Sequence, residues 1–252
     1  MTEAYVKSET QKGICTIEFF HPQSNSLPAQ LLKDLAAAIT HAGEASNTAA
    51  VILRSAGEKT FCAGASFDEL VAIKTEAEGL KFFSGFANVI NAMRVCPKFI
   101  IGRIQGKCVG GGLGLAASVD YAIATDKAEV KLSELAVGIG PFVVGPAVER
   151  KMGVSAFSQL AISATKFYSA DWATENGLFA EKHLSIAAMD ESVNRLANEL
   201  TNSSPDAMAE MKKIFWMGAE HWDTLLIERA AISGRLVLSD FTRNAIAKFK
   251  TK

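Results

Sequence analysis

Short runs of β-branched and aromatic residues alternate with longer stretches of helical periodicity along the first half of the chain. Val6–Ser8 and Ile14–Phe20 predict a β-hairpin with Gly13 near its turn. Ala49–Arg54 and Phe99–Ile104 predict two further strands. Two more strand-like runs follow on either side of a polar turn, at Tyr121–Ala124 and Val130–Leu132.

Helical periodicity fills the intervals between these strands. Pro28 is predicted to open a helix at its first position, with an apolar face that includes Leu31, Leu35 and Ile39. A second helix is predicted from Ala77 to Arg94, before Pro97. This order of strands and helices predicts an α/β architecture with mainly parallel pairing.

The chain beyond Ser155 is almost wholly helical in pattern. A boundary between an α/β body and a helical tail is predicted near residues 195–205. The main helical segments are Ser185–Leu200, Pro205–Met217, Trp222–Leu238 and Ser239–Phe249, the last with Ser239 as its cap.

Composition narrows the class of protein. The chain has 252 residues, 49% of them hydrophobic, and a formal net charge of −1. This near-neutral charge gives no reason to expect nucleic acid or an anionic membrane as a partner. The longest uncharged run, 14 residues at 135–148, is too short and too broken by proline to span a bilayer. Four scattered cysteines without a C-x-x-C pair favour a reducing compartment. We therefore expect a cytoplasmic protein.

A loop of small residues, Phe61-Cys62-Ala63-Gly64-Ala65-Ser66, follows the Ala49–Arg54 strand and a polar stretch. Small side chains leave backbone N–H groups uncovered, so that a ligand oxygen can approach them. A tight turn that needs small residues is the simpler interpretation of this segment when it is taken alone.

Three consecutive glycines, Gly110–Gly112, follow the Phe99–Ile104 strand. Inside a helix each costs about 1 kcal/mol relative to alanine, whereas at a strand-to-helix junction they permit a sharp turn. The amides at such a helix start suit a developing negative oxygen. A dinucleotide-binding fingerprint fails because position 115 is leucine, and a Walker loop fails because Cys108 replaces its Ser/Thr.

A single carboxylate, Glu134, follows the predicted strand at Val130–Leu132 and precedes an apolar stretch. Desolvation there raises the pKa of a carboxyl toward the range useful for acid–base work. A glutamate that stabilises a helix start is the simpler interpretation of this residue alone.

The order and spacing of the three features resemble the crotonase superfamily, that is, enoyl-CoA hydratases and isomerases. The resemblance begins at His21-Pro22 with Asn25-Ser26-Leu27 and spans nearly the whole chain. It continues through the Phe61–Ala65 loop and the glycine run to Asp120 and Glu134, and ends at Asp171-Trp172-Ala173 with Gly177-Leu178.

This resemblance implies a fold, a substrate and a set of roles. The fold is an α/β spiral of β-β-α units over residues 1–197, with a helical region at 198–252 used in trimer contacts. The substrate is an acyl-CoA thioester whose carbonyl lies between the N–H groups of Ala65 and Gly111, with Glu134 as acid and base. A homotrimer or homohexamer is implied, and no cofactor or metal is expected, since CoA is part of the substrate. The substrate-binding residues are predicted to be Ala63, Ser66, Phe67, Gly110 and Pro141.

The pattern departs from the family at Gly114, where its hydratases usually carry a first glutamate. The overall likeness favours hydration of an enoyl-CoA, whereas a lone carboxylate favours, on chemistry alone, a shift of the double bond. The 3-hydroxyacyl-CoA hydrolases of the family also show glycine there and resemble one another in an Asp after a proline, but the stretch Pro141–Val144 of this chain contains no acid. A non-catalytic acyl-CoA-binding protein is the remaining alternative. Asp68 and Glu69 are candidates for a compensating carboxylate, although a solvated helix start is the simpler interpretation of both.

Overall fold

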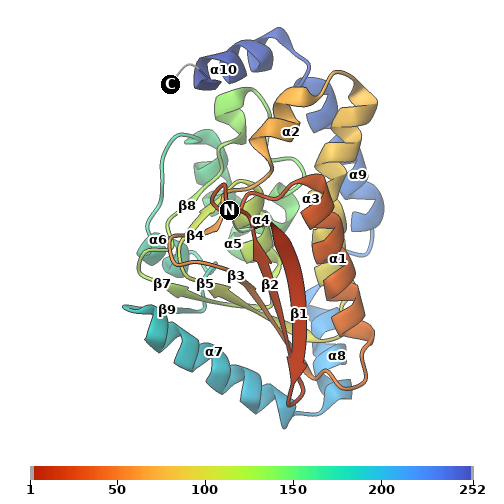
Figure 1. Ribbon diagram of the computed structural model, residues 1–252, viewed down its shortest axis with the longest axis vertical. Helices are drawn as coiled ribbons and strands as arrows, with labels where there is room; N and C mark the ends of the chain where they lie inside the picture. The colour runs from red at the N-terminus through yellow and green to blue at the C-terminus, as the bar shows by residue number, and fades with distance from the viewer. Residues whose placement is uncertain (1–2, 251–252) are drawn as a thin grey trace.

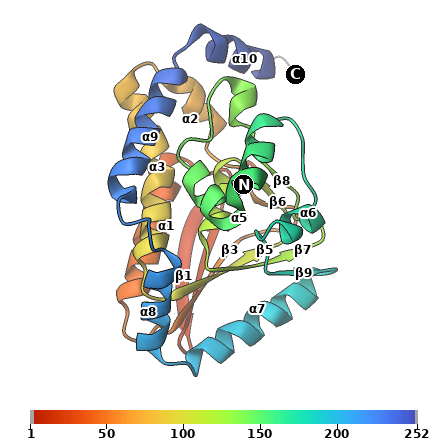
Figure 2. The same ribbon diagram turned by 180° about the vertical axis from the view of Figure 1, so that it is seen from behind.

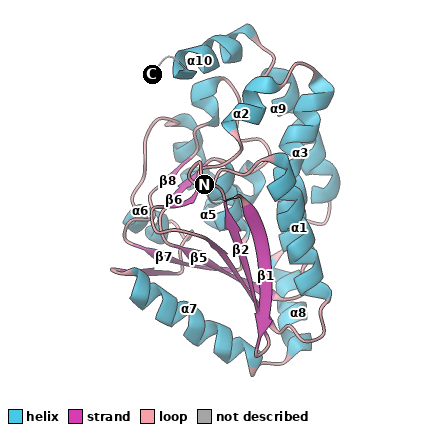
Figure 3. Cartoon of the chain, in the orientation of Figure 1, coloured by secondary structure: helices cyan, strands magenta, loops and turns pink. Residues whose placement is uncertain are grey.

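A computed structural model gives the structure of residues 3–250, with side chains described as far as residue 248. Strands and helices alternate through most of the chain (Figure 3). The strands are β1 (Tyr5–Gln11), β2 (Ile14–Phe20), β3 (Ala50–Ser55), β4 (Thr60–Cys62), β5 (Phe99–Ile104), β6 (Lys107–Val109), β7 (Tyr121–Thr125), β8 (Val130–Lys131) and β9 (Glu181–His183). The helices are α1 (Ala29–Glu44), α2 (Phe67–Ala72), α3 (Glu76–Val95), α4 (Gly111–Ser118), the 3₁₀ helix η1 (Glu134–Val137), α5 (Gly145–Ile162), α6 (Ala170–Glu175), α7 (Ile186–Thr201), α8 (Pro205–Phe215), α9 (Trp222–Leu236) and α10 (Asp240–Lys250).

Two parallel ladders run side by side through the described chain. The larger sheet has the order β1-β2-β3-β5-β7-β9, and only β1 is antiparallel to its neighbour. The smaller sheet has the order β4-β6-β8. In each repeating unit, one strand joins the large sheet and the next strand joins the small sheet. A helix then leads the chain back to the large sheet. The strands β3 and β4 with α3, and β5 and β6 with α4, are two such units.

Helices cover both faces of the large sheet, which explains why β3 and β5 are apolar on both sides. Helix α7 lies along one face, where Met189 and Val193 pack on Ile52, Ile101 and Ile123 (Figure 1). Helices α1, α3 and α4 contribute to the main core on the other side of the sheet, and Figure 2 shows α1 and α3 from behind.

The C-terminal helices pack on the same chain. Helix α9 lies against α3, and a Cβ atom added at Gly79 would come within 2.6 Å of the Gly234 Cα atom. Helix α8 is tied to the sheet by Lys212, whose buried ammonium lies 2.8 Å from Asp120 Oδ2 and donates to the Lys98 carbonyl. The predicted boundary at 197/198 falls within the continuous helix α7, and the trimer contact of residues 198–252 stays a prediction.

The α/β fold with mainly parallel pairing is confirmed, as are the hairpin and the predicted long helices. Pro28 was predicted at the first position of this helix but is the N-cap residue of α1, one residue before Ala29. The strands β4, β6 and β9 were not predicted, because runs of three residues carry no readable periodicity. The helix α5 was not predicted because it contains Pro146, Gly145 and Gly153. Within residues 3–250, no helix is long and apolar enough to cross a membrane.

Candidate active site

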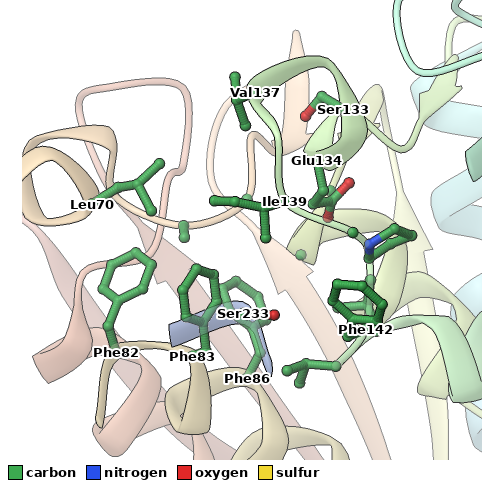
Figure 4. A pocket seen from close by; sticks show the side chains of 18 of the residues that line it. Leu70, Phe82, Phe83, Phe86, Ser133, Glu134, Val137, Ile139, Phe142 and Ser233 are labelled. Carbon is green, nitrogen blue, oxygen red and sulfur yellow. The ribbon is translucent and has the colours of Figure 1, made fainter. Parts of the chain in front are cut away.

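A largely apolar cavity of about 220 Å³ lies where the small sheet meets α2, α3 and η1. Figure 4 shows Phe82, Phe83 and Phe86 on one side of it and Glu134 with Phe142 on the other. Glu134 is the only ionisable side chain in its lining among the described residues. The lining consists of Ala63, Gly64, Ala65, Phe67, Leu70, Phe82, Phe83, Phe86, Gly110, Gly111, Ser133, Glu134, Val137, Ile139, Gly140, Pro141, Phe142, Val143, Val144 and Ser233.

The Ala65 amide is left unpaired by the way its loop docks. Residues 63–66 pair with the segment before α1, since Leu27 N donates to the Gly64 carbonyl at 2.8 Å and Ser66 N donates to the Leu27 carbonyl at 3.3 Å. Leu27 and Ala65 are therefore partners in a parallel bridge. In such a bridge the N–H of the second partner points away from the first strand. The Ala65 N–H has no acceptor within residues 3–250, although Ala65 lines the cavity.

The Gly111 amide also has no acceptor in the described part of the chain, for a different reason. Gly111 is the first residue of α4, and the first N–H groups of a helix have no partner within it. Gly110 before it has φ +53 and ψ −117, a conformation that suits glycine. The ring of Phe86 lies against Gly111, where an added Cβ would come within 2.2 Å of the Phe86 Cζ atom. Phe86 therefore fills the space that a side chain at position 111 would need, and glycine lets the backbone of Gly111 line the cavity.

The two loops are in direct contact. Gly64 has φ +91, and an added Cβ would lie 2.9 Å from the Val109 carbonyl oxygen and 3.3 Å from the Gly111 nitrogen. Only glycine allows this approach. This contact between the two loops brings the unpaired amides of Ala65 and Gly111 to the same wall of the cavity. Two N–H donors placed in this way can bind one negative oxygen.

Glu134 stands beside these amides at the start of η1. An added Cβ at Gly110 would lie 3.0 Å from Glu134 Oε1. The Oε2 atom is shielded from solvent and has no hydrogen-bond partner in the described part of the chain. Burial raises the pKa of the Glu134 carboxyl from its ordinary value of 4.5 to about 7, against the opposing effect of backbone hydrogen bonds from Glu134 and Ser133. Such a carboxyl can accept or donate a proton near neutral pH.

Val144 occupies the space beside Gly114. Gly114 lies in the middle of α4, and an added Cβ there would meet the Val144 Cγ1 atom at 2.5 Å. Val144 is 4% exposed and belongs to the core. The space that a side chain at position 114 would need is therefore filled by the hydrocarbon side chain of Val144.

Most of the residues predicted to bind substrate do line the cavity, namely Ala63, Phe67, Gly110 and Pro141. Ser66 does not, because its hydroxyl caps α2 by accepting a hydrogen bond from Glu69 N. Asp68 and Glu69 point away from the cavity, toward Gln23 and the Ala29 amide. These two carboxylates belong to a solvated helix start.

Ser233 lines the cavity from α9, about a hundred residues further along the chain, and sequence reasoning missed it. No local signal marks it, because an isolated serine in a helix has no distinguishing pattern.

Comparison with known proteins places this geometry in context. The sequence model described as enoyl-CoA hydratase/isomerase matches residues 9–244. A short-chain-enoyl-CoA hydratase of Clostridium acetobutylicum is 28% identical over 247 residues, covering 97% of this chain and 94% of the relative. A carnitinyl-CoA dehydratase of Escherichia coli K12 is 25% identical over 252 residues, covering 92% and 94%. The solved structure of an enoyl-CoA hydratase from Bacillus halodurans superimposes with a TM-score of 0.90 at 20% identity, covering 97% of this chain and 99% of the other. The fold implied by the sequence resemblance is thereby confirmed.

Proposed function

Because the chain belongs to the enoyl-CoA hydratase/isomerase family, we propose that it moves the double bond of an enoyl-CoA through an enolate, with Glu134 as its single acid and base. The observation that carries this proposal is the lone carboxylate of the cavity. Glu134 has a pKa raised to about 7, and Val144 fills the space at Gly114.

The amides of Ala65 and Gly111 form the oxyanion hole in this proposal. Both N–H groups lack an acceptor within the described residues, and both residues line the cavity. When a proton leaves the carbon next to the thioester, negative charge moves to the carbonyl oxygen. Two fixed donors stabilise that oxygen more than the neutral carbonyl, and loss of one donor typically costs about 3 kcal/mol.

Glu134 carries the proton in both steps. For a 3-enoyl-CoA, the carboxylate removes a proton from C2, and the electron pair of that bond forms a dienolate whose oxygen the two amides hold. The protonated carboxyl then gives the proton to C4, and the double bond moves from C3–C4 to C2–C3. One carboxyl with a pKa near neutrality suits both directions, because it is a competent base and a competent acid.

Hydration is the second candidate, favoured by the name of the Clostridium acetobutylicum relative. In that reaction Glu134 takes a proton from water as the oxygen attacks C3, and a proton is delivered to C2. A single carboxyl must then orient water and handle both protons. The apolar lining around Val144 and Phe142 offers this water no second carboxylate within the described cavity, and we therefore place isomerisation first.

The acyl group is proposed to be uncharged. No lysine, arginine or histidine is among the described lining residues, and the commonest lining residues are phenylalanine, glycine and valine. Burying an unpaired carboxylate in such surroundings costs several kcal/mol. A CoA thioester with a plain hydrocarbon chain fits this cavity better than one with a second carboxylate.

One experiment tests the reaction. Purified protein is incubated in D₂O with 3-hexenoyl-CoA and with 2-hexenoyl-CoA, and products are identified by NMR and mass spectrometry. We expect interconversion of the two esters with deuterium at C2 or C4, and a fall of at least 100-fold in Glu134→Gln. Glu69→Gln is the matched control, because Glu69 binds the Ala29 amide outside the cavity, and it should keep wild-type turnover.

The products separate the competing functions. A 3-hydroxyacyl-CoA formed without a double-bond shift would favour hydration, and release of free CoA thiol would favour hydrolysis. Binding of acyl-CoA without any conversion would leave a binding protein. Wild-type turnover in Glu134→Gln would exclude Glu134 as the acid–base residue.

A further inference from the structure

Three buried side chains converge on one backbone carbonyl, that of Thr60, at the first residue of β4. Asn25 Nδ2 donates to it at 2.9 Å, Gln105 Nε2 at 3.2 Å and Ser55 Oγ at 3.5 Å. Asn25 is 5% exposed and Gln105 is 1% exposed. Burying polar side chains is unfavourable unless they are hydrogen-bonded, so a buried network of this kind is expected to have a structural role.

The position of Thr60 in the chain indicates this role. Thr60 begins the segment 60–65, which leads through β4 to Ala65 and which we call the Ala65 arm. Gln105 comes just before the segment 106–111, which leads through β6 to Gly111 and which we call the Gly111 arm. At the base of the two arms the backbones touch, since an added Cβ at Gly106 would lie 2.0 Å from the Lys59 carbonyl oxygen.

The backbone hydrogen bonds between β4 and β6 do not by themselves fix the two arms relative to each other. The pairing of β4 with β6 shifts its register between Thr60 and Cys62, so the strands do not form an uninterrupted ladder. Side-chain hydrogen bonds supply the missing anchor. Gln105 links the arms directly, because it precedes one arm and donates to a carbonyl of the other.

Gln105 is itself held in one orientation. Arg103 Nη1 donates to its Oε1 atom at 3.3 Å, which leaves the Nε2 group to face Thr60 and Ser55. Arg103 in turn pairs with Asp190 of α7 through two hydrogen bonds, at 2.5 and 3.0 Å.

Asn25 donates to the same Thr60 carbonyl. Its backbone is left-handed, with φ 55, a conformation that asparagine tolerates better than most residues. Its Oδ1 atom accepts from His21 N at 3.0 Å, and its Nδ2 group also donates to the Ala56 carbonyl at 2.9 Å. Asn25 therefore joins the segment that pairs with Ala65 to the start of the Ala65 arm.

We propose that Asn25 and Gln105 are positioning residues, which hold the Thr60 carbonyl so that the amides of Ala65 and Gly111 converge on one oxygen. This inference rests on the proposed oxyanion hole. Neither side chain lines the cavity, so both act through the backbone. Displacement of reacting groups by about 1 Å can lower a rate about 100-fold.

The test uses two variants of the full chain. Asn25→Asp keeps the left-handed preference and the acceptor for His21 N but loses both donated hydrogen bonds. Gln105→Met keeps the size of the side chain but loses its donors. Thr125→Val is the matched control, because the Thr125 hydroxyl donates at 2.9 Å to the backbone carbonyl of Gln105 and not to Thr60. Circular dichroism and thermal melts establish that each variant is folded.

Two readouts report on the amides. For turnover of 3-hexenoyl-CoA, we expect kcat to fall about 10- to 100-fold in both variants with KM within about twofold, and to stay near wild type in Thr125→Val. The second readout is the absorption band of bound cinnamoyl-CoA, which moves to longer wavelength when its carbonyl accepts hydrogen bonds. This shift should be reduced by half or more in Asn25→Asp and in Gln105→Met.

The two readouts keep the inference separate from the reaction. If the wild type converts no enoyl-CoA, the proposed function fails, while the absorption shift of the bound ester still tests positioning. The inference is overturned if folded Asn25→Asp and Gln105→Met keep the wild-type shift. It is also overturned if Thr125→Val loses as much of the shift as they do, or if the wild type shows none.

Discussion

Replacement of Glu134 by glutamine should separate the stability of this protein from its activity. The carboxyl has a pKa of about 7 in the folded chain because it is buried, against an ordinary value of 4.5. At 1.36 kcal/mol per pKa unit, this difference corresponds to about 3 kcal/mol of lost stability once the group is ionised in both states. Glutamine has the same shape and no charge, so it avoids this cost.

The sign of the pH dependence follows from the direction of the pKa change. Between about pH 4.5 and 7 the folded state holds a proton that the unfolded state has released. The stability of the wild type therefore falls as pH rises through this window and levels off above it. Glu134→Gln lacks this dependence. We expect the variant to match the wild type near pH 4 and to be more stable by about 3 kcal/mol at pH 8.

Urea denaturation of both proteins at several pH values measures this difference, and turnover is recorded in the same buffers. Wild-type activity as a base should rise with pH to a plateau, with an apparent pKa near 7. A stability difference that is the same at pH 5 and pH 8 would refute the burial argument for Glu134. The matched control is Glu69→Gln, whose carboxylate lies outside the cavity.

Three further predictions concern the packing around the site. Gly64→Ala forces a Cβ to 2.9 Å from the Val109 carbonyl oxygen and should lower turnover about 100-fold, whereas Gly57→Ala, which has a similar φ and open space, should leave turnover unchanged. Gly114→Glu should destabilise the fold by about 1–3 kcal/mol by overpacking against Val144, and adding Val144→Ala should recover stability and raise the ratio of hydration to isomerisation measured by NMR. Lys212→Met should cost about 3–5 kcal/mol in urea denaturation, because it leaves the buried Asp120 carboxylate without its cation.

The features that sequence predicted well depend on local patterns. The hairpin, the buried strands β3 and β5 and the helices α3 and α7 follow from periodicity and from turn or cap residues. The glycine run at 110–112 predicted exposed amides at a helix start because backbone geometry at a strand-to-helix junction is itself local. Glu134 was selected by its place after a strand and before an apolar stretch, and by the resemblance.

Other features required contacts between residues far apart in the chain. Among residues 3–250 the Ala65 amide has no acceptor, because Leu27 pairs with the Gly64 carbonyl and the Ser66 amide beside it. Ser66 is a cap because α2 begins there. Val144 fills the space at Gly114 from the start of α5, a helix that had no clear periodicity.

The two loops of the proposed oxyanion hole and the candidate acid Glu134 could thus be selected from the sequence, because the order and spacing of three short segments carried the resemblance. Their common wall, the pKa of Glu134 and the closure of the position at Gly114 arise only in the folded chain. Desolvation and steric exclusion depend on which distant side chains surround a group, and local sequence carries no record of them.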